Sequence, residues 1–191
     1  ESNLYYEWLR SLDKLTQHYS NCCTTTTTTT SATYTIGELA LGGVIAYILQ
    51  PGDPGYDANV QHGLVATIND ISTSAEWGCV GTLIGTTSNS IGTGNQNTID
   101  IISGCSASGI AAKLCSDLNY GGYSDWYLPS IDELHTVFFN QNTIGGFSNV
   151  NYWSSTESSS DTALAIYFLN GFQGSGNKND TQIYVRAVRS F

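Results

Sequence analysis

A run of seven consecutive threonines, Thr24–Thr30, divides the chain into two unequal parts. A repetitive polar segment has no apolar side chains to bury, so residues 21–32 are interpreted as a linker. The segment before it, residues 1–20, is long enough for a single helix but not for a domain. The sequence therefore predicts one main domain, residues 33–191, preceded by a short helix and a tether.

The helix predicted over residues 1–20 has an apolar stripe. Tyr5, Trp8, Leu12, Leu15 and Tyr19 are separated by steps of three and four residues, which is helical spacing. A single helix of this length is marginally stable in water. We therefore expect it to pack on the main domain or to form a homo-oligomer by packing on copies of itself.

Net charge and the length of the apolar runs each exclude one class of partner. Six Lys and Arg against sixteen Asp and Glu give a net charge of −10, and six cations cannot build the basic surface that nucleic acid requires. No apolar run approaches the roughly 20 residues that span a bilayer, so membrane insertion is not expected. With only 12% charged residues, the surface must consist largely of Ser, Thr, Asn and Gly.

Five cysteines leave at least one thiol unpaired within a monomer. One disulfide among Cys79, Cys105 and Cys115 is one interpretation, and buried apolar thiols are the other. The adjacent Cys22 and Cys23 lie in the linker, where a bond between two chains can form. No Cys-x-x-Cys pair occurs and the histidines, His18, His62 and His135, have no metal-ligand spacing, so neither metal nor cofactor is expected.

The main domain mixes strands and helices. Apolar runs predict strands over residues 42–49 and 62–67, joined by a turn-rich segment, 51–59. Residues 85–97 are expected to form a loop, and helical spacing then extends from Ile99 to Leu118, with Gly121 and Gly122 beyond its end. A second helix begins at Ser130 with a capping box completed by Glu133, which explains the acidic cluster around Asp132 and His135 in structural terms. Residues 151–191 are expected to form short strands and polar loops.

Six segments occur in an order that is typical of one family. They are IGELALGGVIAYI, QHGLVA, EWGC, GGYSDWYLPSIDEL, IGGFSNVNYWSSTESSS and YVRAVRSF. Together they resemble the DUF1566 family, which is similar to the C-terminal domain of collagen-like bacterial adhesins, and the resemblance covers residues 36–191. It implies an α+β, C-type lectin-like fold of the formylglycine-generating-enzyme type, with short twisted antiparallel sheets, two main helices and much loop.

The last forty residues carry a narrower resemblance, to the variable proteins of diversity-generating retroelements. In those proteins adenine-directed mutagenesis rewrites the C-terminal segment, which implies a variable region over about residues 151–191 here. An Asn codon altered at its adenines cannot encode Gln, Glu, Lys, Met or Trp. Between residues 158 and 183 only Gln173, Lys178 and Gln182 break that rule, so these three are not expected to be diversified codons.

The residues interleaved between family-like anchors are the predicted ligand-binding residues. On a strand, Leu164, Ile166 and Phe168 share one face, and residues 163, 165, 167 and 169 share the other. Both faces cannot be the only core of a two-layer domain, so an exposed Tyr–Leu–Phe group predicts a binding patch in which Tyr167 and Phe172 contact the ligand. The full set is Ser158, Asp161, Ala163, Ala165, Tyr167, Leu169, Phe172, Gly174, Ser175, Gly176, Asp180, Thr181 and Ile183.

Two other functions for such a fold are disfavoured by residues that are missing. A formylglycine-generating enzyme needs paired cysteines near the C-terminus, and no cysteine follows Cys115. A calcium-dependent lectin needs a Glu-Pro-Asn tripeptide and a Trp-Asn-Asp, which are absent, and Asp53 and Asp57 are explained by turn chemistry. We therefore expect a non-enzymatic, hypervariable binding protein on a virion or cell surface, with a protein or glycan ligand on a host or target cell. The alternative is an ordinary surface adhesin that binds glycans or glycosaminoglycans without diversification.

Overall fold

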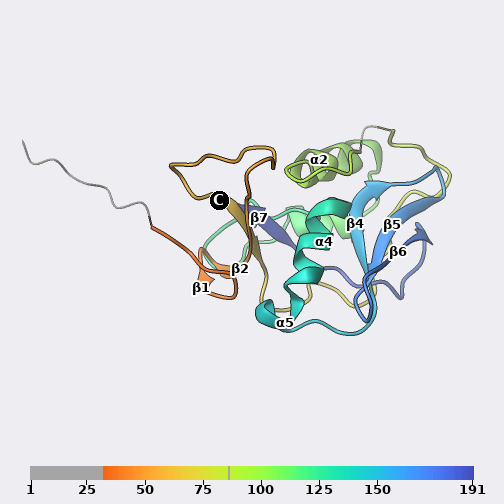
Figure 1. Cartoon of the computed structure of the whole chain (residues 1–191). Helices are drawn as coiled ribbons and strands as arrows, with labels where there is room; N and C mark the ends of the chain where they lie inside the picture. The colour runs from red at the N-terminus through yellow and green to blue at the C-terminus, as the bar shows by residue number, and fades with distance from the viewer. Residues whose placement is uncertain (1–31, 86) are drawn as a thin grey trace, which may run out of the picture. The chain divides into compact units, whose positions relative to one another are not determined.

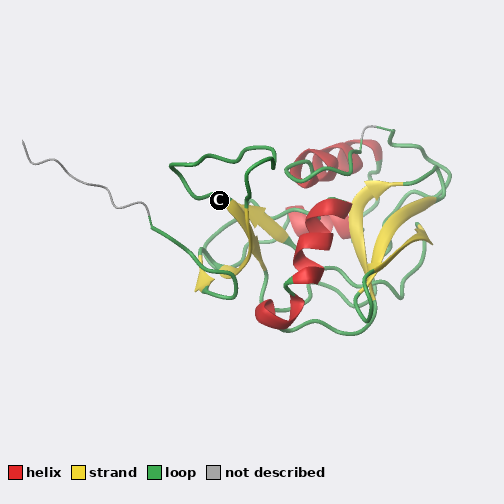
Figure 2. Ribbon diagram, viewed as in Figure 1, coloured by secondary structure: helices red, strands yellow, loops and turns green. Residues whose placement is uncertain are grey.

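The computed structural model describes residues 32–191 except residue 86. The helix predicted over residues 1–20 and nearly all of the linker 21–32 lie outside the described residues. The described part is mixed α+β, with two short antiparallel sheets, four helices and much loop, which confirms the predicted fold class (Figures 1 and 2). Within it, no helix is both long and apolar enough to cross a membrane.

The first sheet is built from both ends of the domain. Its strands have the order β1-β2-β3-β7, and neighbours are antiparallel. The predicted strands 42–49 and 62–67 are confirmed as β2 and β3. The turn chemistry between them is also confirmed, because the Asp53 carboxylate accepts from the Gln50 N–H (2.7 Å) and the Asp57 carboxylate accepts from the Asn59 N–H (2.7 Å). The strands are β1 (Leu39–Ala40), β2 (Gly43–Ile48), β3 (Gly63–Ala66) and β7 (Val188–Ser190).

The second sheet comes from the C-terminal segment. It contains β4 (Asn151–Glu157), β5 (Thr162–Tyr167) and β6 (Phe172–Asn177) in that order. Beyond β6 the chain returns across the sheet, and Tyr184 pairs in parallel with Tyr152 on the outer side of β4. The prediction of short strands and polar loops over residues 151–191 is thus confirmed.

The helices differ from the prediction in two places. The continuous helical pattern from residue 99 to 118 is interrupted, giving α2 (Gly94–Gly104) and α3 (Ala111–Ser116). Gly109 has a φ of 76°, in the left-handed region that favours glycine. The predicted loop 85–97 also ends early, because α2 begins at Gly94. Asn97 and Thr98 are buried on this helix, where they donate to the Ser155 hydroxyl and the Leu128 carbonyl, respectively, whereas Ile99 is exposed.

The helix predicted at Ser130 is confirmed as α4 (Ile131–Phe139), followed by the short α5 (Gln141–Ile144). The Ser130 hydroxyl accepts from the Glu133 N–H (3.2 Å), and the Glu133 carboxylate accepts from the Ser130 N–H (2.8 Å), which completes the capping box. The same carboxylate accepts from the Gly92 N–H (2.9 Å). Burial raises the pKa of Glu133 despite these hydrogen bonds. Glu133 is therefore a structural residue, as its spacing predicts.

Two hydrophobic cores hold the domain together. In the first, α2 and α3 contribute Ile101, Ala111, Ala112 and Cys115, which cluster with Trp77, Trp126 and Trp153. In the second, α4 lies between the two sheets and contacts β2, β4 and β5 (Figures 1 and 2).

Strand β5 contributes to both cores. Ala163 and Ala165 belong to the first core, and Ile166 belongs to the second, as does Phe168 directly after the strand. The sequence argument that one face of this strand must meet solvent is therefore wrong along most of β5. It assumed a single core, whereas the central strand of this sheet is covered on both sides.

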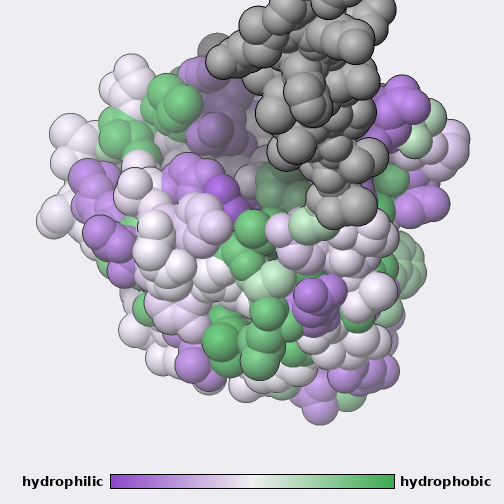
Figure 3. Space-filling view, turned by 90° about the vertical axis from the view of Figure 1, so that its left-hand side faces the viewer, coloured by the Kyte–Doolittle hydropathy of each residue, from purple (hydrophilic) through white to green (hydrophobic). Residues whose placement is uncertain are grey.

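Half of the chain's few cationic side chains lie in the interior of the domain. Of the six cationic residues in the chain, Lys178, Arg186 and Arg189 are buried. Arg186 donates to Asp70 (2.9 Å) and lies 4.0 Å from the centre of the Phe147 ring. On the face seen in Figure 3, hydrophobic residues form separate groups among weakly polar ones.

The cysteines divide between the two interpretations. Cys79 and Cys105 form a disulfide, and Cys115 is a free, buried thiol whose pKa is raised by burial. A thiol with a raised pKa holds little thiolate and is chemically inert. Cys22 and Cys23 lie outside the described residues.

Candidate ligand-binding site

A hollow of about 380 Å³ lies over β5 and β6. Eight of its nine lining residues belong to the predicted ligand-binding set, and the ninth is Asn151, at the start of β4. Residues far apart in the predicted set are thus brought to one place. The lining residues are Asn151, Ala165, Tyr167, Phe172, Gly174, Ser175, Gly176, Asp180 and Ile183.

The floor of the hollow is open because its residues are small. Ala165, Gly174 and Gly176 leave space that larger side chains would fill. At Gly176 a Cβ atom would lie 2.6 Å from the Trp153 ring and 2.8 Å from the Ile183 side chain, so the chain approaches the core too closely for any other residue. At Gly174 a Cβ atom would meet only the Phe172 ring, at 3.2 Å. Gly176 is therefore required by packing, whereas Gly174 keeps the hollow empty.

Two walls border this floor. Tyr167 and Phe172 face each other across the end of the β5–β6 hairpin, and Phe172 is 67% exposed. The opposite wall is the segment that returns from β6 toward the outer side of β4, which supplies Asp180 and Ile183. The hollow thus presents aromatic rings near a carboxylate, a combination suited to recognition by packing and hydrogen bonding.

The remaining predicted residues do not line the hollow, and all but one of them are exposed. The Ser158 and Ser175 hydroxyls are 3.2 Å apart, and Asp161, Leu169 and Thr181 are exposed. Ala163 is fully buried in the first core and cannot touch a ligand, so its inclusion is wrong. Ala163 is buried because hydrophobic cores cover both faces of β5.

Ala165 and Ile183 are also core residues, with only 4% and 3% of their surface exposed. They lie at the floor of the hollow and determine its shape, but they offer a ligand almost no surface. The prediction that their side chains form part of a variable surface is wrong for the same packing reason.

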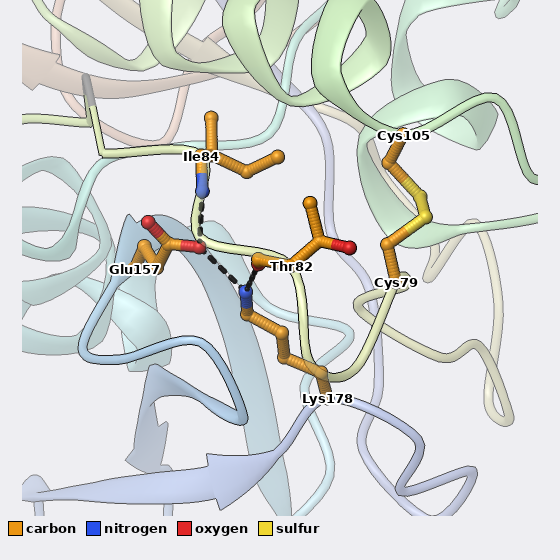
Figure 4. The surroundings of a disulfide bond; sticks show 6 residues. All are labelled: Cys79, Thr82, Ile84, Cys105, Glu157 and Lys178. Atoms are coloured by element: carbon orange, nitrogen blue, oxygen red, sulfur yellow. Dashed lines mark hydrogen bonds and ion pairs between the residues drawn. A yellow bond between two sulfur atoms is a disulfide. The ribbon is translucent and has the colours of Figure 1, made fainter.

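Lys178 holds the end of β6 from inside. Its ammonium group donates to the Glu157 carboxylate (2.5 Å) and to the Thr82 carbonyl (2.8 Å) (Figure 4). It also lies 4.6 Å from the centre of the Trp77 ring. Glu157 in turn accepts from the Ile84 N–H (2.9 Å) (Figure 4). These contacts connect β4, β6 and the loop after Trp77.

The disulfide fixes the other end of that loop. Cys79 is bonded to Cys105 at the end of α2 (Figure 4). The Gly81 N–H donates to the Ser160 carbonyl (3.0 Å) before β5 begins. The backbone beneath the hollow is therefore held by contacts that involve none of its exposed side chains.

Sequence reasoning missed Asn151 and the Lys178–Glu157 ion pair. Asn151 becomes a lining residue only because β4 pairs with Tyr167 in this register. The single Lys in the charge-poor C-terminal segment was the available signal for the ion pair. The burial of this Lys cannot be inferred from its neighbours in sequence, because Glu157 and Trp77 become adjacent to it only in the folded chain.

The described residues hold no cluster of three or more His, Cys, Asp or Glu side chains that could bind a metal ion. The hollow itself offers two aromatic rings, a carboxylate, two hydroxyls and an amide. These groups are suited to noncovalent recognition of a ligand.

The domain is similar to a known protein family. The family model described as the Lcl C-terminal domain matches residues 66–189, which include the three strands around the hollow. No curated protein sequence matches the chain.

We predict that Lys178→Met lowers the free energy of unfolding by about 3–5 kcal/mol, because it leaves the buried Glu157 carboxylate without its counter-ion. In the double variant with Glu157→Gln the loss should be smaller than the sum of the two single losses. Urea unfolding measures all three.

Lys113→Met is the matched control, because the ion pair of Lys113 with Asp117 is solvent-exposed. It should change the free energy of unfolding by less than about 1 kcal/mol. Equal costs for Lys113→Met and Lys178→Met, or strict additivity of the two substitutions at the buried pair, would contradict the assignment.

Proposed function

Because the chain belongs to the Lcl C-terminal domain family, we propose that residues 33–191 form a non-enzymatic ligand-binding domain with a C-type lectin-like fold. The proposed ligand is a protein or glycan on the surface of a host or target cell. The proposed location is a virion or cell surface.

The observation that carries this proposal is that exposed members of the predicted ligand-binding set, Phe172 and Ser175, line one hollow. The hollow combines a glycine floor with an aromatic wall, and the Phe172 ring exposes apolar surface to solvent. Exposed apolar surface of this kind is typical of a binding site. Tyr and Phe rings lose little conformational entropy on binding, which makes them effective contact residues.

We further propose that the exposed residues of this surface are diversified by a retroelement. The support is physical. The β5–β6 hydrogen bonds are made by the backbone and do not depend on side-chain identity. Trp153, Lys178 and Arg186 are buried and hold the frame from within. The side chains of Phe172, Ser175 and Thr181 can therefore change without loss of the fold.

We predict that filling the hollow abolishes binding. The full chain is screened against a glycan array and a phage-displayed random peptide library, and the selected probes are retested on variants. Gly174→Leu, which places a side chain in the hollow, and the pair Tyr167→Ala with Phe172→Ala should each weaken binding at least tenfold.

Ile99→Ala is the control, because it truncates an exposed apolar side chain on α2, outside the hollow. It should leave binding unchanged. Selection of no probe, or of probes that bind Gly174→Leu as well as the original chain, would refute the proposed site.

A second prediction concerns the gene. A near-copy of the DNA encoding the last residues should lie nearby, beside a reverse-transcriptase gene, and should differ from it mainly at adenines. Sequences from related isolates should vary at Phe172, Ser175 and Thr181 and keep Lys178. Genome sequencing tests both points, and absence of the near-copy would favour an adhesin with a fixed surface.

A further inference from the structure

Strand β6 is an open edge of its sheet. On the other side of the sheet, the outer edge of β4 is covered, because the Trp153 N–H donates to the Tyr184 carbonyl (3.0 Å) and the Tyr184 N–H donates to the Asn151 carbonyl (2.9 Å). Among the described residues, β6 pairs with no strand other than β5. The sheet can therefore be extended only beyond β6.

The hydrogen-bond pattern identifies which groups of β6 are free. The Phe168 N–H donates to the Val150 carbonyl, on the β4 side, so alternation directs the backbone groups of Ala165 toward β6. Its partner Gly174 is then paired with β5, and the backbone groups of Gln173 and Ser175 point outward. Along this outer edge the only backbone bond among described residues is at Asn177, whose carbonyl accepts from the Asp180 N–H (2.8 Å).

This edge lacks the features that keep exposed strands from pairing. Natural edge strands are protected by Lys, Pro, bulges or a covering segment. The sequence of β6 is Phe-Gln-Gly-Ser-Gly-Asn, without charge or proline, and its register with β5 runs without a bulge. All six residues are exposed or half-buried. An unprotected strand of about 20 Å is thus available beside the hollow.

The charge of the surroundings selects the partner. Asp161 and Asp180 lie at the end of β6, whereas the nearby cation, Lys178, is buried and paired with Glu157. A second copy of this chain would bring the same excess of sixteen acidic over six basic residues, so charge disfavours pairing of two β6 strands. A cationic strand is favoured instead.

We propose that β6 binds an extended, Lys- or Arg-rich peptide segment of a partner protein, which joins the sheet as a further strand. The proposal rests on the proposed function and names the class of its ligand. Backbone hydrogen bonds to Gln173 and Ser175 provide affinity. Alternate side chains of the peptide lie toward the hollow, where Gly174 leaves room beside Phe172.

The experiment uses the full chain and a synthetic peptide of sequence TKVKTKVKTK with blocked ends, followed by fluorescence anisotropy. Ser175→Pro removes an outward N–H while leaving the β5–β6 bonds in place, and Ser175→Ala is the matched control that keeps the N–H. We expect Ser175→Pro to weaken binding at least tenfold more than Ser175→Ala does, because only the proline removes the N–H. The same peptide with Glu in place of Lys should not bind measurably.

A second measurement protects against misfolding of the proline variant. The original chain is tested with two N-methylated forms of the Lys peptide, one methylated at its odd-numbered residues and the other at its even-numbered residues. One of these two peptides should bind at least tenfold more weakly than the unmethylated peptide. Equal binding of Ser175→Pro and Ser175→Ala, with no effect of either methylated peptide, would overturn strand addition.

Self-association is the remaining outcome. Dimers in sedimentation that Ser175→Pro dissociates would overturn the choice of a cationic partner. The proposed function fails separately, if filling the hollow by Gly174→Leu leaves every selected ligand bound.

Discussion

Strand β5 lies between two hydrophobic cores, and this position limits where the domain can expose side chains to a ligand. Ala163 and Ala165 face one core and Ile166 faces the other, so Tyr167, at the end of the strand, is the main side chain that β5 offers to the hollow. Side chains that can change without loss of stability are therefore limited to the end of the β5–β6 hairpin, to β6 and to the segment that returns from β6 toward β4. The hollow lies where these three meet.

Buried cations maintain this arrangement. Lys178, Arg186 and Arg189 each pair with a carboxylate and lie over an aromatic ring, so half of the chain's positive charge is used inside the domain. Breaking a buried pair is costly because it leaves an uncompensated charge. The same use of cations leaves the outer surface acidic, which connects the stability of the frame to the kind of partner that the surface favours.

Local chemistry was predictable from the sequence, and long-range packing was not. The capping box at Ser130 and the strands around residues 45 and 65 follow from spacing over a few residues. The family-like segments predicted the α+β class and placed the site in the C-terminal strands. The burial of Ala163 could not be inferred, because it depends on α2 and α3 covering the face of the sheet opposite α4. The Lys178–Glu157 pair was missed for a similar reason, since it joins residues that are adjacent only after the hairpin folds.

The stability of the domain should not depend on the exposed side chains around the hollow. Urea unfolding of single alanine variants measures this dependence. Phe172, Ser175 and Thr181 should each change the free energy of unfolding by no more than about 0.5 kcal/mol, whereas Trp153 and Phe168 should each cost about 3–5 kcal/mol. Losses at the exposed positions as large as those at the two buried rings would contradict the account.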